Sequence, residues 1–283
     1  MKKHTTVVLS LITVFLLSLT LLPAALASDL APFAGQSGSL RIAGGTAHIP
    51  VMKEAAREII TFNPDIRISI AGGGSGLGIR QVGEGLIDIG NAGRYPTDQE
   101  IQKYQLVIFQ WAVDGVAAIV HPDNPVRNLT GKQLQDIFSG AIRNWKEVGG
   151  GDHAINLYSR DASSGTRQVF WKKGLHKEEI SQRANIVVSN GAMKTAIGHD
   201  PHGIGYVSVG HIDKTVAPVA LDGVAPTLDN VRTGKYKVAR GLYSLTRGTP
   251  HGLAALFLDY LYSKSGEQII AAKGFIPVPR ENR

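Results

Sequence analysis

The chain of 283 residues contains no cysteine, and that absence excludes two designs at once. No disulfide can hold the fold together, and no cysteine is present to carry a lipid anchor. A protein without disulfides must be stabilised by its hydrophobic core, and a chain of this length is long enough to bury one.

Runs of basic residues are also missing. The formal net charge is +7, from 30 Lys and Arg against 23 Asp and Glu, and this modest excess favours an anionic partner. The chain lacks the clustered Lys and Arg with interleaved aromatic residues that are typical of a nucleic-acid surface. Short pairs such as Lys172–Lys173 are expected to be solvated helix faces. We therefore expect no nucleic-acid partner.

Several motifs of catalytic or cofactor sites are absent as well. No glycine precedes a Lys-Ser or Lys-Thr pair as a P-loop requires, and the glycine run at 73–78 does not have the Rossmann spacing. Leu77 stands where a nucleophile elbow built on Ser75 would need glycine. The stretch 199–202, His-Asp-Pro-His, could suggest a metal site, but its proline and the glycine after it predict a surface loop. We expect no catalytic residue, no metal and no cofactor.

One long apolar run is present, at the N-terminus. Lys2 and Lys3 precede the apolar segment 7–22, and an Ala-Leu-Ala signal at 25–27 ends before Ser28. This order predicts a cleaved signal peptide over residues 1–27 and an exported, periplasmic protein without a lipid anchor. A transmembrane anchor is the weaker alternative, because the run is short and ends in small residues.

The remainder of the chain alternates between short apolar strands and helical segments, with glycine-rich loops between them. This pattern predicts an α/β fold with parallel strands, in which ligands bind beyond the carboxyl ends of the strands. The expected strands are 39–43, 66–70, 87–90, 116–120, 154–158, 203–209 and 240–246, and the expected helices are 50–62, 79–86, 131–138, 168–171, 192–197, 250–262 and 266–272.

The alternation continues through two halves without an internal repeat or a low-complexity linker. We expect a hinge near Asp114–Gly115 and a return of the chain near Lys237. Lobe I would then comprise residues 28–114 and 238–283, and lobe II residues 115–237. Two intertwined lobes fit this pattern better than two successive domains.

Three loops pair a hydroxyl with the start of a helix. Thr46, Ser75 and the stretch 164–166, Ser-Gly-Thr, each follow or contain glycine just before a helical segment. A helix N-terminus has unpaired N–H groups and positive potential, and glycine allows close backbone approach. Three such ends can surround a tetrahedral oxyanion, and Arg160 and Arg94 would add charge-assisted contacts.

These motifs, taken in order along the chain, resemble a known family. The chain is similar to the periplasmic phosphate-binding proteins of ABC importers, which have the type II periplasmic binding protein fold. The segments that carry the resemblance are Gly-Gly-Thr-Ala-His-Ile-Pro at 44–50, Gly-Gly-Ser-Gly at 73–76, Asp-Ile-Gly-Asn-Ala at 88–92, and 160–166, with weaker support from 129–145 and 203–206.

The resemblance implies a two-lobed fold with a ligand cleft between the lobes and a two-strand hinge. It implies a monomeric receptor that binds inorganic phosphate with high affinity as hydrogen phosphate, closes over it, and delivers it to a transmembrane ABC permease. The residues that would hold the anion are Thr46 with the backbone of Ala47, Ser75, Arg160, Ser164, Gly165 and Thr166.

The chain departs from this family at one place. The better-studied members of the family carry an aspartate shortly after the third strand, which accepts the proton of hydrogen phosphate and repels sulfate, while some relatives have Ser-Arg there. Here Gly93–Arg94 occupies that place, and an arginine cannot accept a hydrogen bond. Our hypothesis is that Asp114 or Asp161 supplies the acceptor. If neither does, the site would also take sulfate or another tetrahedral oxyanion.

Two functions of other classes stay open from the sequence. An exported phosphoester hydrolase or transferase could use the same anion-binding loops, but it would need a general base or metal, and no spaced His/Asp cluster provides one. A sensor or scaffold could use the bound anion as a signal. Loss of phosphate uptake on deletion would favour transport over the sensor.

Overall fold

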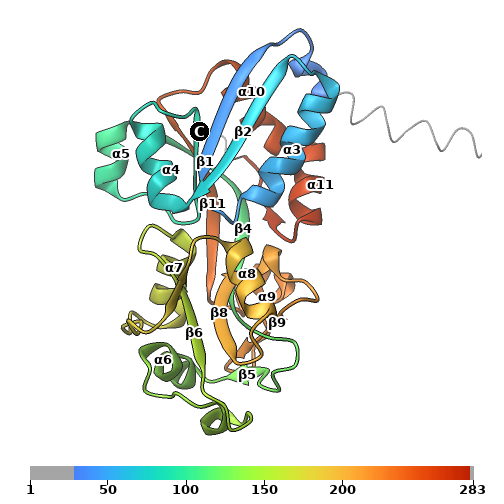
Figure 1. The fold of residues 1–283 in the computed structure, drawn as a ribbon. Coiled ribbons are helices and arrows are strands. Elements are labelled where there is room, and N and C mark those ends of the chain that lie inside the picture. The colour runs from blue at the N-terminus through green and yellow to red at the C-terminus, as the bar shows by residue number, and fades with distance from the viewer. Residues whose placement is uncertain (1–28, 281–283) are drawn as a thin grey trace, which may run out of the picture.

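The computed structural model describes residues 29–280, which form a mixed α/β fold (Figure 1). The predicted signal peptide, residues 1–27, lies outside the described residues. Across residues 29–280, no helix has both the length and the apolar character needed to cross a membrane.

The strands and helices follow one another along the whole described chain. The strands are β1 (Gly38–Gly44), β2 (Ile66–Gly73), β3 (Ile89–Ala92), β4 (Leu106–Val120), β5 (Asn128–Leu129), β6 (Asn156–Arg160), β7 (Asn185–Val187), β8 (Gly203–Ser208), β9 (Ala217–Pro218), β10 (Ala220–Leu221), β11 (Ala239–Arg247) and β12 (Ile276–Pro277). The helices are η1 (Ala31–Phe33), α3 (Ile49–Phe62), α4 (Gly74–Gly83), α5 (Asp98–Tyr104), α6 (Gly131–Ser139), η2 (Trp145–Val148), α7 (Gly165–Val169), η3 (Phe170–Gly174), α8 (Asn190–Gly198), η4 (Val209–His211), α9 (Leu228–Arg232), α10 (Gly252–Leu261) and α11 (Lys264–Ala272).

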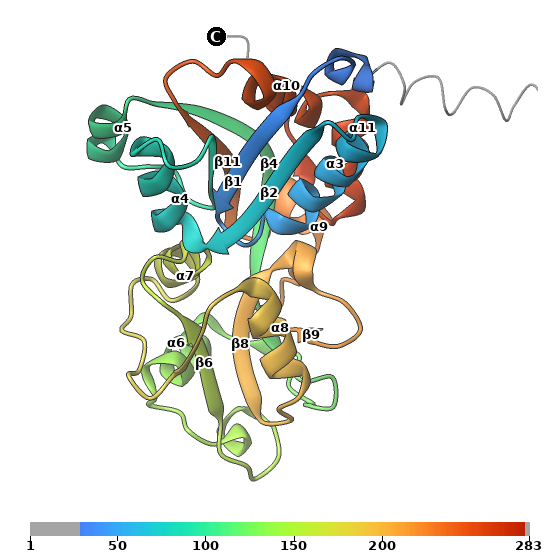
Figure 2. The ribbon, with the colours of Figure 1, turned by 45° about the horizontal axis from the view of Figure 1, so that its top comes forward.

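One continuous sheet runs through the molecule in the order β2-β1-β3-β11-β4-β8-β6-β7, with β9 and β12 also paired to β4. The strands β2, β1 and β3 are parallel, as are β8, β6 and β7. Strands β11 and β4 join the two parallel groups by antiparallel pairing. The carboxyl ends of the parallel strands of both groups lie toward the middle of the molecule (Figures 1 and 2).

The structure has an upper part and a lower part in the view of Figure 1, each with its own buried clusters. In the upper part, α3, α10 and α11 cover one face of the sheet and α4 and α5 the other. In the lower part, α6 and η3 cover one face and α8 the other. Each face is therefore shielded from water by a helix layer, as parallel strands require.

Strands β4 and β11 connect the two parts. The sequence predicts a strand only over 116–120, but β4 has 15 residues and extends from the upper part into the lower. Its register with β11 places Ala239 opposite Gly115, at the level where the parts meet. The missed residues, 106–115, are mostly apolar and lack a regular two-residue alternation, and they pair with β11 along their length and with β12 only at Ala112 and Val113.

The other predicted elements are present, with shifted ends. The largest shift is at α4, which begins at Gly74 instead of 79 and ends at Gly83 instead of Leu86. Gly85 has a φ of 74°, a left-handed conformation that ends the helix, and Leu86 is 55% exposed.

Candidate functional site

A small pocket lies where the upper and lower parts meet. The groups that line it lie so close together that no space for even one water molecule is left between them, so an anion can enter only when the two parts move apart. Its lining residues are Gly45, Thr46, Ala47, His48, Gly74, Ser75, Gly93, Arg160, Ser164, Gly165, Thr166 and Arg240.

The three predicted loops converge on this pocket from both parts. The upper part contributes the loop between β1 and α3 and the junction of β2 with α4, and the lower part contributes the loop between β6 and α7. Each loop ends at a helix N-terminus, whose first N–H groups have no partner within the helix. Ser164 caps α7 by accepting a hydrogen bond from Arg167 N at 3.2 Å.

Glycine is required where the loops touch each other. Gly73 and Gly74 have φ values of 121° and 85°, which residues with a side chain rarely adopt. A Cβ on Gly74 would also lie 2.8 Å from Ser163 Oγ, and a Cβ on Gly165 would clash with Ser75 Oγ. The close contact of the upper and lower loops therefore depends on these positions having no side chain.

Seven of the eight residues predicted to hold an anion line the pocket. The exception is Arg94. Its guanidinium donates two hydrogen bonds of 2.7 Å to the carboxylate of Glu100, and this pairing holds the pKa of Glu100 below its usual value. Arg94 lies instead beside Tyr95 and Thr97, in a separate surface pocket. The structure thus places Arg94 outside the predicted site, with its charge already neutralised.

Arg160 is the charged side chain in the pocket with the most buried nitrogens that have no hydrogen-bond partner within residues 29–280. It is 1% exposed, and its Nη2 donates to Val188 O at 3.0 Å. Its Nε and Nη1 are buried and have no hydrogen-bond partner among the described residues. Burial lowers the pKa of the guanidinium, which is the expected effect on a cation with too few partners. An anion in the pocket would supply the missing acceptors.

Arg240, which no local sequence pattern marks, provides a second guanidinium. Its Nε donates to Asp114 Oδ2 at 2.9 Å, and its Nη2 lies 2.8 Å from the same oxygen. Its Nη1 donates to Gly93 O at 3.3 Å and to Thr166 Oγ1 at 3.1 Å. Arg240 therefore ties both parts together at the pocket, and unlike Arg160 it has a carboxylate beside it.

Neither proposed proton acceptor lines the pocket. Asp114 is fully buried behind Arg240 and accepts a further hydrogen bond from Ser208 Oγ at 2.9 Å. Burial raises the pKa of Asp114, and the contacts with Arg240 and Ser208 oppose that shift. Asp161 accepts hydrogen bonds from the backbone N and the hydroxyl of Ser163. In this arrangement an anion in the pocket has no direct contact with either carboxylate.

Asn190 is a second residue that sequence analysis did not select. It is fully buried at the first turn of α8, and its side chain and backbone N both donate to Thr46 Oγ1 in the upper part. The sequence around it, Ser-Asn-Gly, indicates only a helix cap, and Ser189 does cap α8. Nothing local in the sequence shows that α8 points toward the pocket.

Two histidines lie beside the pocket in their neutral form, of which His48 is fully buried and His211 partly buried. His48 lines it and packs edge-on against Trp111, with 5.5 Å between ring centroids. Burial and the charge of Arg240 lower the pKa of His48 to about 3. His211, in η4, lies against the backbone of Thr46 and Ala47, and burial, with Lys194 and Arg240, lowers its pKa to about 4. Neither histidine adds positive charge at neutral pH.

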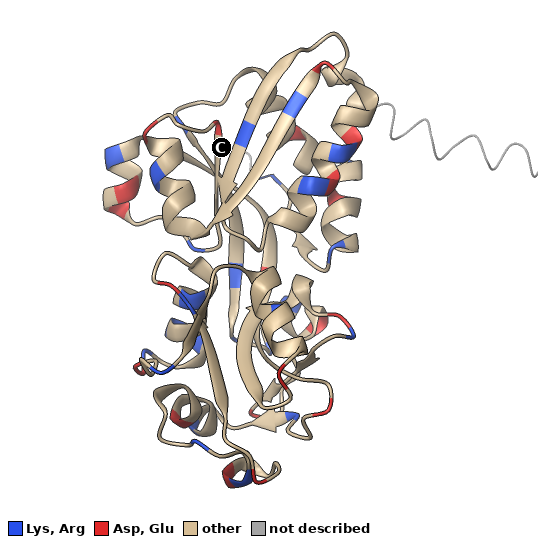
Figure 3. Cartoon of the chain, in the orientation of Figure 1, with Lys and Arg blue, Asp and Glu red and all other residues tan. Residues whose placement is uncertain are grey.

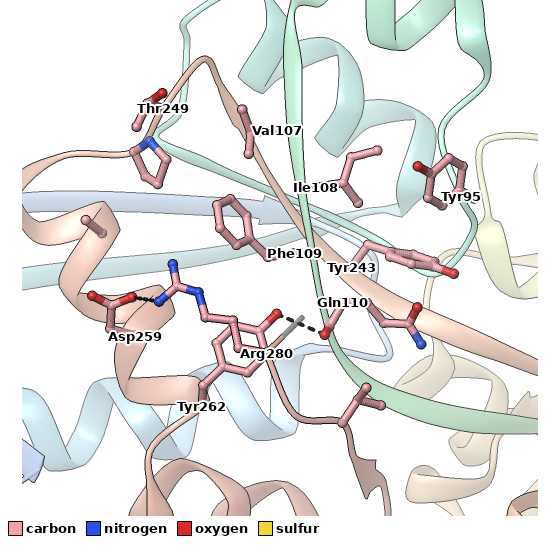
Figure 4. A pocket seen from close by; sticks show the side chains of 13 residues that line it. Tyr95, Val107, Ile108, Phe109, Gln110, Tyr243, Thr249, Asp259, Tyr262 and Arg280 are labelled. Atoms are coloured by element: carbon pink, nitrogen blue, oxygen red, sulfur yellow. Dashed lines mark hydrogen bonds and ion pairs between the residues drawn. The ribbon is translucent and has the colours of Figure 1, made fainter. Parts of the chain in front are cut away.

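A wider pocket of about 780 Å³ lies in the upper part (Figure 4). Arg280 lies over the rings of Phe109 and Tyr262, at 5.8 and 5.6 Å from their centroids, and forms an ion pair with Asp259. Its arginine is thus already paired with a carboxylate. This pocket offers no buried, unpaired charge, in contrast to the pocket at Arg160.

A metal site is not formed within residues 29–280, where no cluster of three or more His, Asp or Glu could hold an ion. The stretch 199–202 is a loop after α8. Asp200 accepts hydrogen bonds from Asn156 Nδ2, Tyr158 Oη and the backbone N of His202. The carboxylate therefore serves to hold this loop against β6.

Comparison with known proteins relates the chain to anion-binding receptors. A family model described as the PBP superfamily domain matches residues 31–265. The phosphate-binding protein PstS of Bacillus subtilis (strain 168) is 41% identical over 245 residues, which cover 86% of this chain and 81% of that protein. The PstS of Pseudomonas aeruginosa (strain PAO1) is 30% identical over 273 residues, which cover 87% and 84%.

Solved structures show the same similarity. A phosphate ABC transporter substrate-binding protein of Clostridium perfringens, crystallised with bound phosphate, has a TM-score of 0.80 and 36% identity, over 85% of this chain and 100% of that one. An ABC-type phosphate transport receptor of Vibrio cholerae has a TM-score of 0.67 and 34% identity, over 84% and 99%. The mixed α/β architecture and the order of its elements are thus shared with both.

Proposed function

We propose a function on one premise: the chain belongs to the PstS family of phosphate-binding proteins, within the PBP superfamily. This chain binds inorganic phosphate in the pocket at Arg160 and delivers it to the membrane permease of an ABC phosphate importer. The family consists of binding proteins, so membership confirms the expectation of a receptor rather than an enzyme.

The buried guanidinium of Arg160 is the observation that carries this proposal. Two of its nitrogens have no partner, and the neighbouring cation, Arg240, already has Asp114. A buried charge without partners costs several kcal/mol unless a counter-ion balances it. An anion with several oxygens can accept from Nε and Nη1 together and from the hydroxyls around them.

The donors around the pocket suit a tetrahedral anion. Thr46 and Ser75 lie on the upper side and Ser164 and Thr166 on the lower, each at or near a helix N-terminus. A tetrahedral ion directs its oxygens to four sides, so it gains contacts with both parts only when they are together. Binding energy is then coupled to the closeness of the two parts.

The structure supports a division into two lobes that close over the ligand. Lobe I is residues 28–114 with 238–283 and lobe II is residues 115–237, and β4 and β11 form the hinge between them. Gly76 N donates to Ser163 O at 3.0 Å, and Ser163 Oγ lies 3.1 Å from Gly73 O, with its single proton shared between Gly73 O and Asp161. These contacts cross between the lobes and break when the cleft opens, so they favour the closed form.

We place the mature protein in the periplasm, as a monomer without a lipid anchor. The signal-like residues 1–27 and the absence of cysteine support this assignment. Figure 3 shows basic and acidic residues mixed over the outer elements of both parts, which supports a small anion rather than a nucleic acid as the partner. The closed form presents the surfaces of both lobes to the permease.

Calorimetric titration of the purified protein with phosphate and with sulfate tests the proposal. We expect one phosphate per chain and weaker binding of sulfate. Gly165→Ala should weaken phosphate binding by at least about tenfold, because the added Cβ clashes with Ser75 Oγ and keeps the loops apart. Gly131→Ala is the matched control, since a Cβ there has no neighbour closer than 3.4 Å.

Each outcome of this titration has a clear meaning. No heat with phosphate in protein freed of bound anion would overturn the proposal. Equal affinity for phosphate and sulfate would replace it by the broader reading, a receptor for tetrahedral oxyanions. Turnover of a phosphoester without added protein partners would instead favour the hydrolase or transferase.

A further inference from the structure

Four hydroxyls line the pocket, and the structure shows which of their lone pairs are already occupied. A hydroxyl has one proton to donate and two lone pairs that accept. Ser75 Oγ accepts from Gly93 N at 2.9 Å, and Ser164 Oγ accepts from Arg167 N at 3.2 Å. Each serine therefore keeps one free lone pair.

The two threonines differ from the serines. Thr46 Oγ1 accepts from the backbone N of Asn190 at 3.2 Å and from its Nδ2 at 3.0 Å. Thr166 Oγ1 accepts from Arg240 Nη1 at 3.1 Å and from Asn190 Nδ2 at 3.4 Å. Both lone pairs of each threonine are used, so each can act toward a ligand only as a donor.

The side-chain amide of Asn190 is held in the orientation in which its nitrogen donates to both threonines. Its Oδ1 accepts from Ser208 N at 3.0 Å, so the two protons of Nδ2 must point the other way, toward the two threonines. Asn190 is fully buried, and no water can exchange for these contacts. The amide of Asn190 thus donates hydrogen bonds to Thr46 in the upper part and to Thr166 in the lower part.

We infer that Asn190 is a positioning residue that makes Thr46 and Thr166 obligate donors and leaves Ser75 and Ser164 as the hydroxyls that accept the proton of hydrogen phosphate. The inference rests on the proposed function and assigns the acceptor role for which no carboxylate is available in the pocket. Because Asn190 reaches Thr46 across the cleft, the donor set is complete only when the two parts meet.

Asn190→Asp tests this assignment. The carboxylate keeps the shape of the amide and the acceptor for Ser208 N, but it cannot donate, so Thr46 and Thr166 would turn their protons toward it and away from the anion. Sulfate then meets only acceptors at these positions, whereas hydrogen phosphate can still donate its own proton. We expect phosphate affinity to fall by about tenfold and sulfate affinity by about a hundredfold or more at mildly alkaline pH.

The readout is therefore the ratio of phosphate to sulfate affinity, which a merely structural role of Asn190 would not change. Asn185→Asp, five residues earlier on an exposed position, is the matched control for charge and should leave the ratio as it is. An equal loss for both anions, or no loss, would overturn the inference while leaving phosphate binding by the wild type intact. Absence of phosphate binding in the wild type would overturn it together with the proposed function.

A second route applies if Asn190→Asp does not fold. Asn190→Ala, Thr46→Val and the double variant form a cycle in which each removes one side of the same contact. We expect the double variant to bind phosphate about tenfold more tightly than it would if the affinity losses of the two single variants multiplied. Independent effects would show that Asn190 does not act through Thr46.

Discussion

Replacing Arg160 by methionine should abolish tight phosphate binding and, in the same variant, stabilise the ligand-free protein. Both effects follow from one observation, the two buried guanidinium nitrogens without partners. Methionine has a similar length and no charge, so it fills the space without requiring a counter-ion. Most substitutions in a binding site only weaken binding. Weaker binding together with a more stable free protein therefore indicates a buried charge without partners.

The size of each effect can be worked out from the structure. A charge-assisted hydrogen bond contributes about 1.5–3 kcal/mol, so two of them, from Nε and Nη1, correspond to about 3–6 kcal/mol. That is a loss of between about two and four powers of ten in affinity. In the free protein, removing the unsatisfied charge should recover about 1–3 kcal/mol. Val188, whose carbonyl loses Nη2, is 74% exposed, so water can replace that bond.

Calorimetry and thermal unfolding measure the two effects on the same samples. Copurified phosphate must first be removed, by unfolding and refolding in phosphate-free buffer, because bound ligand raises the melting temperature. For a protein of this size, about 1–3 kcal/mol raises the melting temperature by roughly 2–10 °C. Phosphate should then raise it further in the wild type and leave it unchanged in Arg160→Met.

Two control variants separate charge from geometry. Arg183→Met removes an exposed arginine of the same lobe and should change neither quantity. Arg160→Lys keeps the charge but loses the planar fork, and we expect intermediate affinity. If Arg160→Met bound phosphate as the wild type does, or if its free form were less stable, the argument from the unpaired guanidinium would be refuted.

Two further predictions concern residues outside the anion contacts. Arg94→Met should leave phosphate affinity within about twofold, because Arg94 is paired with Glu100 away from the pocket; a loss of tenfold or more in calorimetry would return Arg94 to the site. His211 should make stability depend on pH. Its folded pKa of about 4 lies below the unfolded value of about 6.5, so its contribution to stability is full above that higher value and falls by about 3 kcal/mol as the pH drops toward 4, in addition to the fall that His48 causes. Urea unfolding at a series of pH values should show this fall reduced in His211→Gln, and an unchanged slope would contradict the assignment.

Much of the fold and the anion-binding loops could be predicted because their signals are local. A hydroxyl beside glycine at the start of an apolar helix marks Thr46, Ser75 and Ser164, and each lies where its own loop and helix place it. The same is true of Thr130, which caps α6 and whose hydroxyl accepts from Gln133 N. Strand ends and helix starts depend on a few neighbouring residues, so a single sequence shows them.

The residues that the sequence did not reveal depend on contacts between distant segments. Arg240 meets Asp114 across 126 residues of chain, and Asn190 meets Thr46 across 144. Arg94 was expected at the pocket because it follows the third strand, but Glu100, six residues later, pairs with it first. No local pattern distinguishes an arginine that reaches a ligand from one that meets a carboxylate. Tertiary geometry alone decides this.

The location of phosphate selectivity follows from the charges at the pocket. Arg94 and Arg240 are balanced by Glu100 and Asp114, so Arg160 is the one lining cation without a paired carboxylate among the described residues. Hydrogen phosphate and sulfate both carry two negative charges at mildly alkaline pH, so this cation and the helix N-termini attract them alike. Charge therefore cannot separate the two anions, and only a group that accepts the proton of phosphate can. With both carboxylates outside the pocket, we assign that role to a hydroxyl with a free lone pair, and the contacts of Asn190 decide which hydroxyls have one.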